Sequence, residues 1–271
     1  MNRIPDYITL TCDIVAWMCK YCNDNKIESL VVGVSGGIDS AVSSTLAAKT
    51  GLPTYVVGMP IKQNDAQETL SDAHMYWLEK NYKNVTVLKA DLSDVFGKFT
   101  ETIGKECGME YVVNKMACAN TRSRLRMVTL YQIAASVNGI VVGTGNKVED
   151  YGVGFYTKYG DGGVDIAPIA DLYKTEVWEL AESLGVNERI VNAAPTDGLW
   201  DDGRTDESQI GASYELLEWV MENNIPLEDA DSYSEDERLA IQQYHKFNTM
   251  NKHKMLPIPT FKVEQPELMS V

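Results

Sequence analysis

The sequence has few basic side chains and no long apolar run. Its 271 residues include 24 lysines and arginines but 39 aspartates and glutamates, which gives a formal net charge of −15. Nucleic acids and anionic membranes are normally bound through basic surfaces, so neither is expected as a partner. No segment approaches the roughly 18 consecutive apolar residues that a transmembrane helix needs, and we therefore expect no membrane span.

Cysteine is sparse, and its spacing does not form a metal site. Of the five cysteines, Cys19 and Cys22 make a single C-x-x-C pair, and no second pair or nearby histidine completes a zinc site. Both lie on an amphipathic segment, so we interpret them as ordinary helix residues. The odd cysteine count and the absence of a signal peptide favour a reducing, cytoplasmic location.

The chain also lacks linkers, internal repeats and low-complexity tracts. Its composition is ordinary for a globular protein, with 44% hydrophobic and 23% charged residues, and its length is ample for a buried core. We therefore expect a single domain that spans residues 1–271.

Apolar segments alternate with helical ones along the chain. Short apolar runs predict strands at 30–34, 54–58, 85–89 and 139–142. Helical patterns predict helices at 40–49, 66–80, 92–106, 117–137, 175–184, 213–223 and 235–248. Apolar strands separated by helices indicate an α/β fold, with a doubly wound parallel sheet flanked by helices. In such sheets ligands bind at the carboxyl ends of the strands, where residues 35–40 and 143–149 lie.

The segment SGGIDS at residues 35–40, between the first strand and its helix, carries the clearest functional signal. Glycines let the backbone approach an oxyanion closely, and the free N–H groups at a helix N-terminus attract negative charge. The carboxylate of Asp39 beside a phosphate site requires a cation between them, so the segment predicts bound phosphate together with Mg²⁺. No lysine follows the glycines, which excludes the GxxxxGK[ST] phosphate loop.

Residues 33–37 also match G-x-S-x-G, the nucleophile elbow of α/β-hydrolases. In that alternative Ser35 is the nucleophile, and His245 or His253 is the base. Such an elbow normally follows several strands, whereas this one follows the first, and the alternative leaves Asp39 without a role. A non-catalytic nucleotide sensor is a further class, which measurable turnover would exclude.

The strand, the SGGIDS loop and the helix together resemble the pyrophosphate loop of the N-type ATP pyrophosphatases. Further segments resemble one branch of them, the NAD synthetase family: NTRSRLRM at 120–127, GTGN at 143–146, FYTKYGDGG at 155–163 and PTDGLW at 195–200. The resemblance implies a five-stranded sheet of the adenine nucleotide alpha hydrolase-like, or Rossmann-like, type. A GMP synthetase or tRNA thiolase of the same superfamily is the alternative, and the acidic charge opposes tRNA binding.

The resemblance also implies roles for individual residues. Asp39 and Glu149 hold Mg²⁺. The choice of Glu149 over its neighbour Asp150 stays open, because this chain has one more residue between Glu149 and Lys158 than many relatives. Asp39 and Lys174 are the expected catalytic residues. Lys174 lies in the first turn of a predicted helix, where the dipole disfavours a cation, and this favours an anionic ligand as its partner. The expected ATP-binding residues are Gly33, Val34, Ser35, Gly36, Gly37, Ile38, Asp39, Ser40, Thr144, Lys174 and Thr196.

A second group of residues is expected to bind the nicotinic acid dinucleotide. Lys158, within FYTKYGDGG, supplies positive charge near a pyridine carboxylate and so favours the acid over the amide. By resemblance, the whole group is Arg124, Lys158, Asp165, His253 and Lys254.

The implied reaction is the ATP- and Mg²⁺-dependent amidation of nicotinic acid adenine dinucleotide (deamido-NAD) to NAD. The pyridine carboxylate attacks the α-phosphate of ATP, diphosphate leaves, and ammonia then displaces AMP. The protein contributes positioning and electrostatic stabilisation rather than a nucleophile. Only about 28 residues precede the first strand, too few for a glutaminase, so free ammonia is the expected nitrogen source.

The helix predicted at 117–137 is apolar on nearly all sides from Leu125 onward. A helix that is apolar all round must be buried all round. One face can pack on the sheet, and either a second copy of the chain or the chain's own C-terminal helices must cover the other. The resemblance implies a homodimer and so favours the first arrangement.

Overall fold

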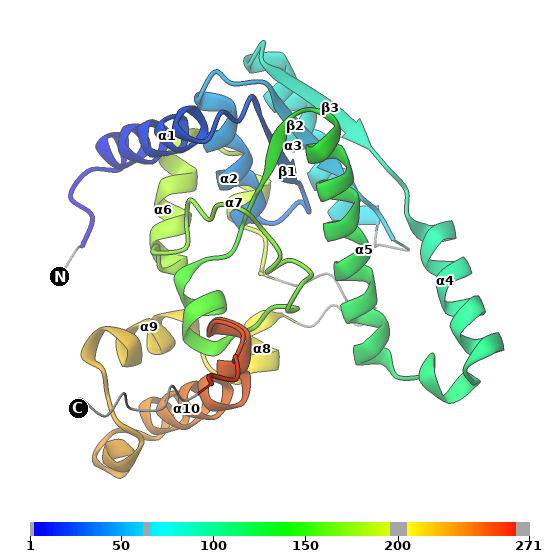
Figure 1. Ribbon diagram of the computed structural model, residues 1–271. Coiled ribbons are helices and arrows are strands. Elements are labelled where there is room, and N and C mark those ends of the chain that lie inside the picture. The colour runs from blue at the N-terminus through cyan, green and yellow to red at the C-terminus, as the bar shows by residue number, and fades with distance from the viewer. Residues whose placement is uncertain (1–2, 62–64, 196–204, 264–271) are drawn as a thin grey trace, which may run out of the picture.

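Four parallel strands form the sheet of the computed structural model, which describes residues 3–61, 65–195 and 205–263 (Figure 1). The sheet order is β3-β2-β1-β4, so the chain builds the sheet outward from β1 and then crosses to the other side of β1. Each strand lies within one residue of its predicted position. The strands are β1 (Ser29–Gly33), β2 (Thr54–Gly58), β3 (Val85–Lys89) and β4 (Gly139–Val142).

The expectation of five strands is wrong for the described part of the chain. After β4 the chain returns alongside it at Ile166, where a single parallel bridge joins Ile166 to Val142. The Gly143 amide donates to the Ile166 carbonyl at 2.7 Å. Pro168 follows two residues later, and a proline has no N–H to continue a ladder. The fifth segment therefore ends as one bridge rather than as a strand.

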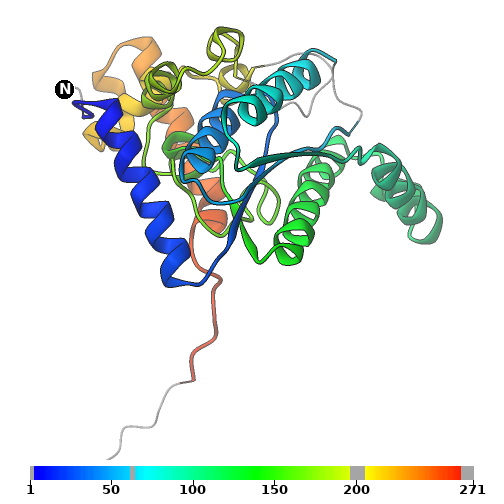
Figure 2. The same ribbon diagram turned by 90° about the horizontal axis from the view of Figure 1, so that it is seen from above.

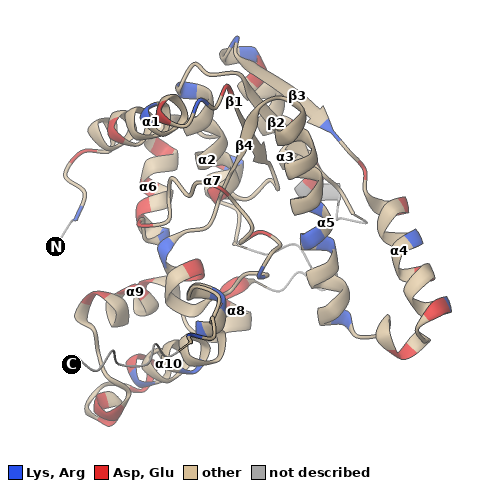
Figure 3. Ribbon diagram, in the orientation of Figure 1, with Lys and Arg blue, Asp and Glu red and all other residues tan. Residues whose placement is uncertain are grey.

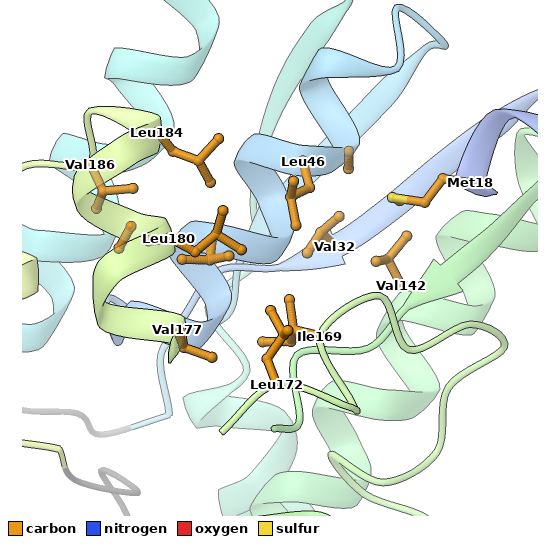
Figure 4. Close-up of a cluster of buried hydrophobic side chains, with 14 of the residues drawn as sticks. Met18, Val32, Leu46, Val142, Ile169, Leu172, Val177, Leu180, Leu184 and Val186 are labelled. Atoms are coloured by element: carbon orange, nitrogen blue, oxygen red, sulfur yellow. The ribbon is translucent and has the colours of Figure 1, made fainter. Parts of the chain in front are cut away.

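Helices cover both faces of the sheet, as a doubly wound fold requires (Figures 1 and 2). Leu30 and Val32 of β1 pack with α1, α2 and α6, in the cluster drawn in Figure 4. Val31, between them in sequence, packs on the opposite face with α4 and α5. The first six α-helices of the chain are α1 (Tyr7–Asp24), α2 (Ile38–Lys49), α3 (Asp65–Asn81), α4 (Ser93–Glu106), α5 (Lys115–Ser136) and α6 (Lys174–Leu184).

A second group of helices packs together beyond the carboxyl ends of the strands (Figure 1). Val148 and Val153 of the π-helix η2 share a core with Tyr214 and Leu217 of α9. The last helix, α10, continues seven residues past its predicted end at 248, because Asn251 donates to the carbonyl of Val153 at the end of η2 and Lys254 donates to the carbonyl of Gly154 that follows it. The remaining elements are η1 (Met109–Tyr111), η2 (Lys147–Val153), α7 (Glu188–Val191), α8 (Asp206–Ile210), α9 (Tyr214–Asn223), η3 (Leu227–Ser232) and α10 (Glu235–Met255).

Within the described residues, every helix falls short of the length and apolarity that crossing a membrane demands.

Candidate active site

The carboxyl ends of β1 and β4 lie side by side, at the point where the sheet order reverses. Doubly wound folds bind their ligands in the crevice at such a point. A cavity of about 300 Å³ opens there. The cavity is lined by all eight residues of 33–40, and Thr144, Glu149 and Lys174 line it as well. The structure therefore brings together every ATP-site residue predicted from the sequence except Thr196, which lies outside the described residues.

The loop between β1 and α2 is shaped for an anion. Gly36 has φ +90°, which favours glycine, and Gly37 is the N-cap of α2 with no side chain to occupy the first N–H groups. The Ser35 hydroxyl accepts from the Gly37 amide at 3.2 Å and lies 3.1 Å from the Ser40 hydroxyl. Two hydroxyls and the helix N-terminus therefore converge where the sequence predicts a phosphate.

Lys174 joins the two carboxylates that were predicted to hold metal. Its Nζ lies 2.6 Å from Asp39 Oδ2 and 2.9 Å from Glu149 Oε1. The lysine side chain is 2% exposed, and the two carboxylates are 18% and 15% exposed. The partner expected for Lys174 was an anionic ligand, whereas in this structure the lysine bonds to two carboxylates of the protein itself.

The ionisation of this cluster is governed by burial and by the lysine. Burial raises the pKa of Asp39, and the Lys174 ammonium opposes that shift. Burial also disfavours ionised Glu149, but Lys174 and a hydrogen bond from Tyr214 together lower the Glu149 pKa. For Lys174 the cost of burial is outweighed by the two carboxylates, which raise its pKa. The Lys174 ammonium therefore favours the ionised form of both carboxylates, against the cost of their burial.

A π-helix explains how both Glu149 and Asp150 reach the cavity. Asn146 caps η2, since its Oδ1 accepts from the Val148 and Glu149 amides at 3.1 and 3.0 Å. Its Nδ2 lies 3.2 Å from Asp39 Oδ1, which ties η2 to the phosphate loop. A π-helix is wider than an α-helix and typically absorbs one extra residue. Both carboxylates, which are neighbours in this π-helix, line the cavity.

Asp150 and Glu149 have different surroundings. The Asp150 carboxylate lies against Gly145, where an added Cβ would be 1.8 Å from Asp150 Oδ2. Burial, together with the charges of Asp161 and Glu149, holds the pKa of Asp150 well above its usual range. Of these two candidates for the second metal ligand, only Glu149 accepts a hydrogen bond from Lys174, which also donates to Asp39.

Asp161 and Arg126 also line the cavity, although sequence reasoning did not predict them as site residues. Asp161 accepts from the Ser123 hydroxyl and the Thr157 amide, and burial raises its pKa. Arg126 Nε donates to the Met59 carbonyl at 3.0 Å, and burial lowers its pKa to about 10. Arg126 alternates with Arg122 and Arg124 along α5, where Figure 3 shows separate blue segments, and so the sequence alone did not single it out.

The residues predicted to bind the dinucleotide form a separate set that does not line the cavity. Three are connected: exposed Arg124 donates to the Lys158 carbonyl, and Lys158 Nζ donates to the His253 carbonyl at 2.7 Å. Lys254 Nζ donates to two carbonyls that follow η2. The Asp165 carboxylate instead accepts from the β4 backbone and from a tyrosine of α5, so it braces the sheet in this structure.

The hydrolase alternative fails on the positions of the histidines. His74 bonds to Ser44, whereas His245 and His253 bond to backbone carbonyls. None of these described contacts reaches Ser35, whose hydroxyl interacts with Ser40 and Gly37 instead. Within the described residues, no histidine is therefore placed as the base that a nucleophilic Ser35 needs.

Comparison with known proteins identifies the family of this chain. The family model described as NAD synthase matches residues 10–258. An NH(3)-dependent NAD(+) synthetase from Alkaliphilus metalliredigens is 39% identical over 238 residues, which cover 86% of this chain and 93% of the relative. An NMN synthetase structure from Francisella tularensis has a TM-score of 0.83 at 29% identity, covering 95% of this chain and 99% of that chain. An NH3-dependent NAD synthetase structure from Campylobacter jejuni, 22% identical, has a TM-score of 0.74 and so shares the fold, covering 96% and 100%. The chain therefore belongs to the NAD synthase family.

Proposed function

We propose that this chain is a ligase that amidates nicotinic acid adenine dinucleotide to NAD, with ATP and ammonia as co-substrates. The observation that carries the proposal is the convergence of the phosphate loop at 35–40 with the Asp39–Lys174–Glu149 cluster in one cavity. Family membership gives the reaction class, since the curated relatives are NH(3)-dependent NAD(+) synthetases. The odd number of cysteines in the sequence supports the reducing cytoplasm as its location.

In the proposed reaction a carboxylate oxygen of the substrate attacks the α-phosphorus of ATP, and the bond from that phosphorus to diphosphate breaks. The loop N–H groups and the hydroxyls of Ser35 and Ser40 would hold the phosphates of the leaving group. Lys174 now bonds to the carboxylates of Asp39 and Glu149. When ATP is bound, its phosphoryl oxygens would compete with these carboxylates for the Lys174 ammonium, which would then stabilise their negative charge. Ammonia then attacks the acyl carbon, AMP leaves with the electron pair of the broken bond, and ammonia loses a proton.

The residues present fit a magnesium ion. Oxygens of Asp39 and Glu149 already converge on one cation, the Lys174 ammonium, within 2.9 Å. Magnesium is usually held by one or two carboxylates together with phosphate oxygens and water. In the part of the chain that the structure describes, no group of three or more His, Cys, Asp or Glu is arranged to hold a metal ion. When bound there, Mg²⁺ would neutralise charge on the phosphates of ATP.

One observation favours a second candidate substrate, the mononucleotide of nicotinic acid. The NMN synthetase from Francisella tularensis has a TM-score of 0.83, against 0.74 for the NAD synthetase from Campylobacter jejuni. Both acids carry the same pyridine carboxylate and differ by the AMP part. The chemistry proposed for the cavity is the same for either acid.

A competition assay decides the substrate and the nitrogen source together. The purified chain would receive ATP, Mg²⁺, and equal amounts of the dinucleotide and mononucleotide acids, with either ammonium or ammonia-free glutamine. We expect NAD as the main product, one AMP per amide formed, and turnover with ammonium only. Preferential formation of NMN would establish the second candidate. Equal rates with glutamine would contradict the expected nitrogen source.

We also propose that the chain forms a homodimer through α4, η1 and α5. Only Ala119, Ser123 and Ala134 of α5 are buried. The C-terminal helices pack around η2 and do not cover α5. Large apolar side chains are at least 45% exposed across this surface: Val95, Phe99, Met109, Tyr111, Val113, Met116 and Val128. Such a concentration of exposed apolar side chains is typical of a protein interface.

Sedimentation equilibrium tests the dimer. We expect a mass twice the 30.1 kDa of one chain, and a loss of activity per chain on dilution below the dimer dissociation constant. Val128→Glu should shift the equilibrium toward monomer, because it places a charge in the proposed interface. Ile8→Glu, at the 70% exposed Ile8 on α1, should leave it unchanged. A fully active wild-type monomer would refute the proposal.

A further inference from the structure

Tyr214 contacts two members of the Asp39–Lys174–Glu149 cluster. Its hydroxyl donates to Glu149 Oε1 at 2.5 Å, the same oxygen that accepts from Lys174. The centroid of its ring lies 5.2 Å from the Lys174 Nζ. Tyr214 is fully buried, and its ring meets Trp178 edge to face, with the centroids 5.9 Å apart. The hydroxyl is therefore held rigidly at one oxygen of the proposed metal ligand.

Helix α9 also hydrogen-bonds to Thr175, the residue that follows Lys174. Glu218 lies one turn after Tyr214 on α9, so the two side chains share a face. The carboxylate of Glu218 accepts from the Thr175 amide at 3.0 Å and from the Thr175 hydroxyl at 2.6 Å. Both groups of Thr175 are thereby fixed at the start of α6. Helix α9 thus contacts the cluster from two directions, through Glu149 and through the backbone next to Lys174.

The location of the hydroxyl decides which Glu149 oxygen is engaged. Oε1 accepts both from Tyr214 and from Lys174, so the carboxylate is oriented with that oxygen toward α9 and α6. Partners that hydrogen-bond to a metal-binding carboxylate fix its orientation, and removing them typically weakens metal binding or activity by about 10- to 100-fold. A tyrosine in an apolar helix pattern gave no sign of this role in the sequence.

We propose that Tyr214 is a positioning residue, whose hydroxyl orients the Glu149 carboxylate for the divalent cation that accompanies ATP. The inference rests on the proposed function, because it takes Glu149 to be a metal ligand. Tyr214 does not touch the reacting atoms in this proposal. It acts through Glu149, and its removal should therefore alter metal affinity rather than nucleotide affinity.

The test is a Mn²⁺ titration of Tyr214→Phe, followed by electron paramagnetic resonance in the presence of α,β-methylene-ATP, which cannot be cleaved to diphosphate. The variant keeps the ring and its packing, and loses only the hydroxyl. We expect Mn²⁺ to bind about tenfold more weakly than to the wild type. Affinity for the nucleotide analogue in EDTA should change by less than about twofold. Tyr244→Phe, a partly buried tyrosine whose ring meets His245, is the matched control and should bind Mn²⁺ as the wild type does.

A double-mutant cycle separates positioning from a general loss of structure. In a Glu149→Gln background, Tyr214→Phe should change Mn²⁺ affinity by less than about twofold, because its effect passes through Glu149. Additive losses, or equal affinities of Tyr214→Phe and wild type, would overturn the inference. A wild type that binds no Mn²⁺ with the analogue would instead overturn the proposed metal site, on which the inference depends.

Discussion

Asp39→Asn is expected to lower kcat/KM for ATP by about 100-fold or more, equivalent to about 2.7 kcal/mol of transition-state stabilisation. The substitution keeps the shape of the side chain but removes one full negative charge from the proposed metal site. The new amide would also present a neutral group to Lys174, which now bonds the Asp39 carboxylate at 2.6 Å. Half-saturating Mg²⁺ should therefore rise at the same time. Steady-state kinetics over a range of Mg²⁺ concentrations measure both effects.

Asp24→Asn is the matched control for this experiment. Asp24 also pairs with a lysine, Lys20, but on the exposed surface of α1. Surface ion pairs contribute little, so its kinetics should stay within about twofold of the wild type. Near-normal activity of Asp39→Asn at low Mg²⁺ would show that Asp39 is not a metal ligand.

Lys174→Met should destabilise the ligand-free protein by about 3 to 5 kcal/mol, because it leaves two buried carboxylates without their cation. The lysine is 2% exposed and lies within 2.9 Å of both. Mg²⁺ alone should then stabilise the variant more than the wild type, since the ion can replace the missing ammonium. Urea unfolding at neutral pH, with and without Mg²⁺, measures these differences. Lys20→Met, which removes an exposed lysine, should change stability by less than about 0.5 kcal/mol.

The pH dependence of the same variant has a definite sign. Without Lys174, the two facing carboxylates repel each other, and one of them binds a proton at a raised pKa. An acid whose pKa is raised in the folded state destabilises the fold above that pKa, and this effect disappears as the pH falls through it. The difference in the free energy of unfolding between wild type and Lys174→Met should therefore become smaller from pH 8 to pH 5. A gap that widens over this interval would contradict the assignment.

The sheet was predictable because its strands are short, apolar and separated by clear helices. β2, β3 and β4 have the predicted bounds, and β1 differs by one residue. The prediction of a fifth strand was wrong, because it was taken from the fold of the resembled family and not from an apolar run in this chain. Asp165 and Ile166 lie beside β4, yet Pro168 prevents further pairing.

The candidate site was predictable where its residues are adjacent in sequence, and much less so where they are distant. The phosphate loop at 35–40 could be interpreted from glycines and a helix start alone. In contrast, Lys174 is 135 positions from Asp39, and Tyr214 is 65 positions from Glu149. Their meeting depends on how α6 and α9 pack around η2, which no local pattern encodes. The extra residue between Glu149 and Lys158 was noted in the sequence, but the π-helix at η2 could not be predicted from it.

Transfer of oxygen from substrate to AMP tests the central claim most directly. Deamido-NAD labelled with ¹⁸O in its pyridine carboxylate would be converted by the chain with unlabelled ATP and ammonium, and the products analysed by mass spectrometry. If that carboxylate attacks the α-phosphorus, each AMP formed must carry one ¹⁸O and diphosphate must carry none. Label in diphosphate or inorganic phosphate, or AMP without label while NAD accumulates, would contradict activation through an adenylate.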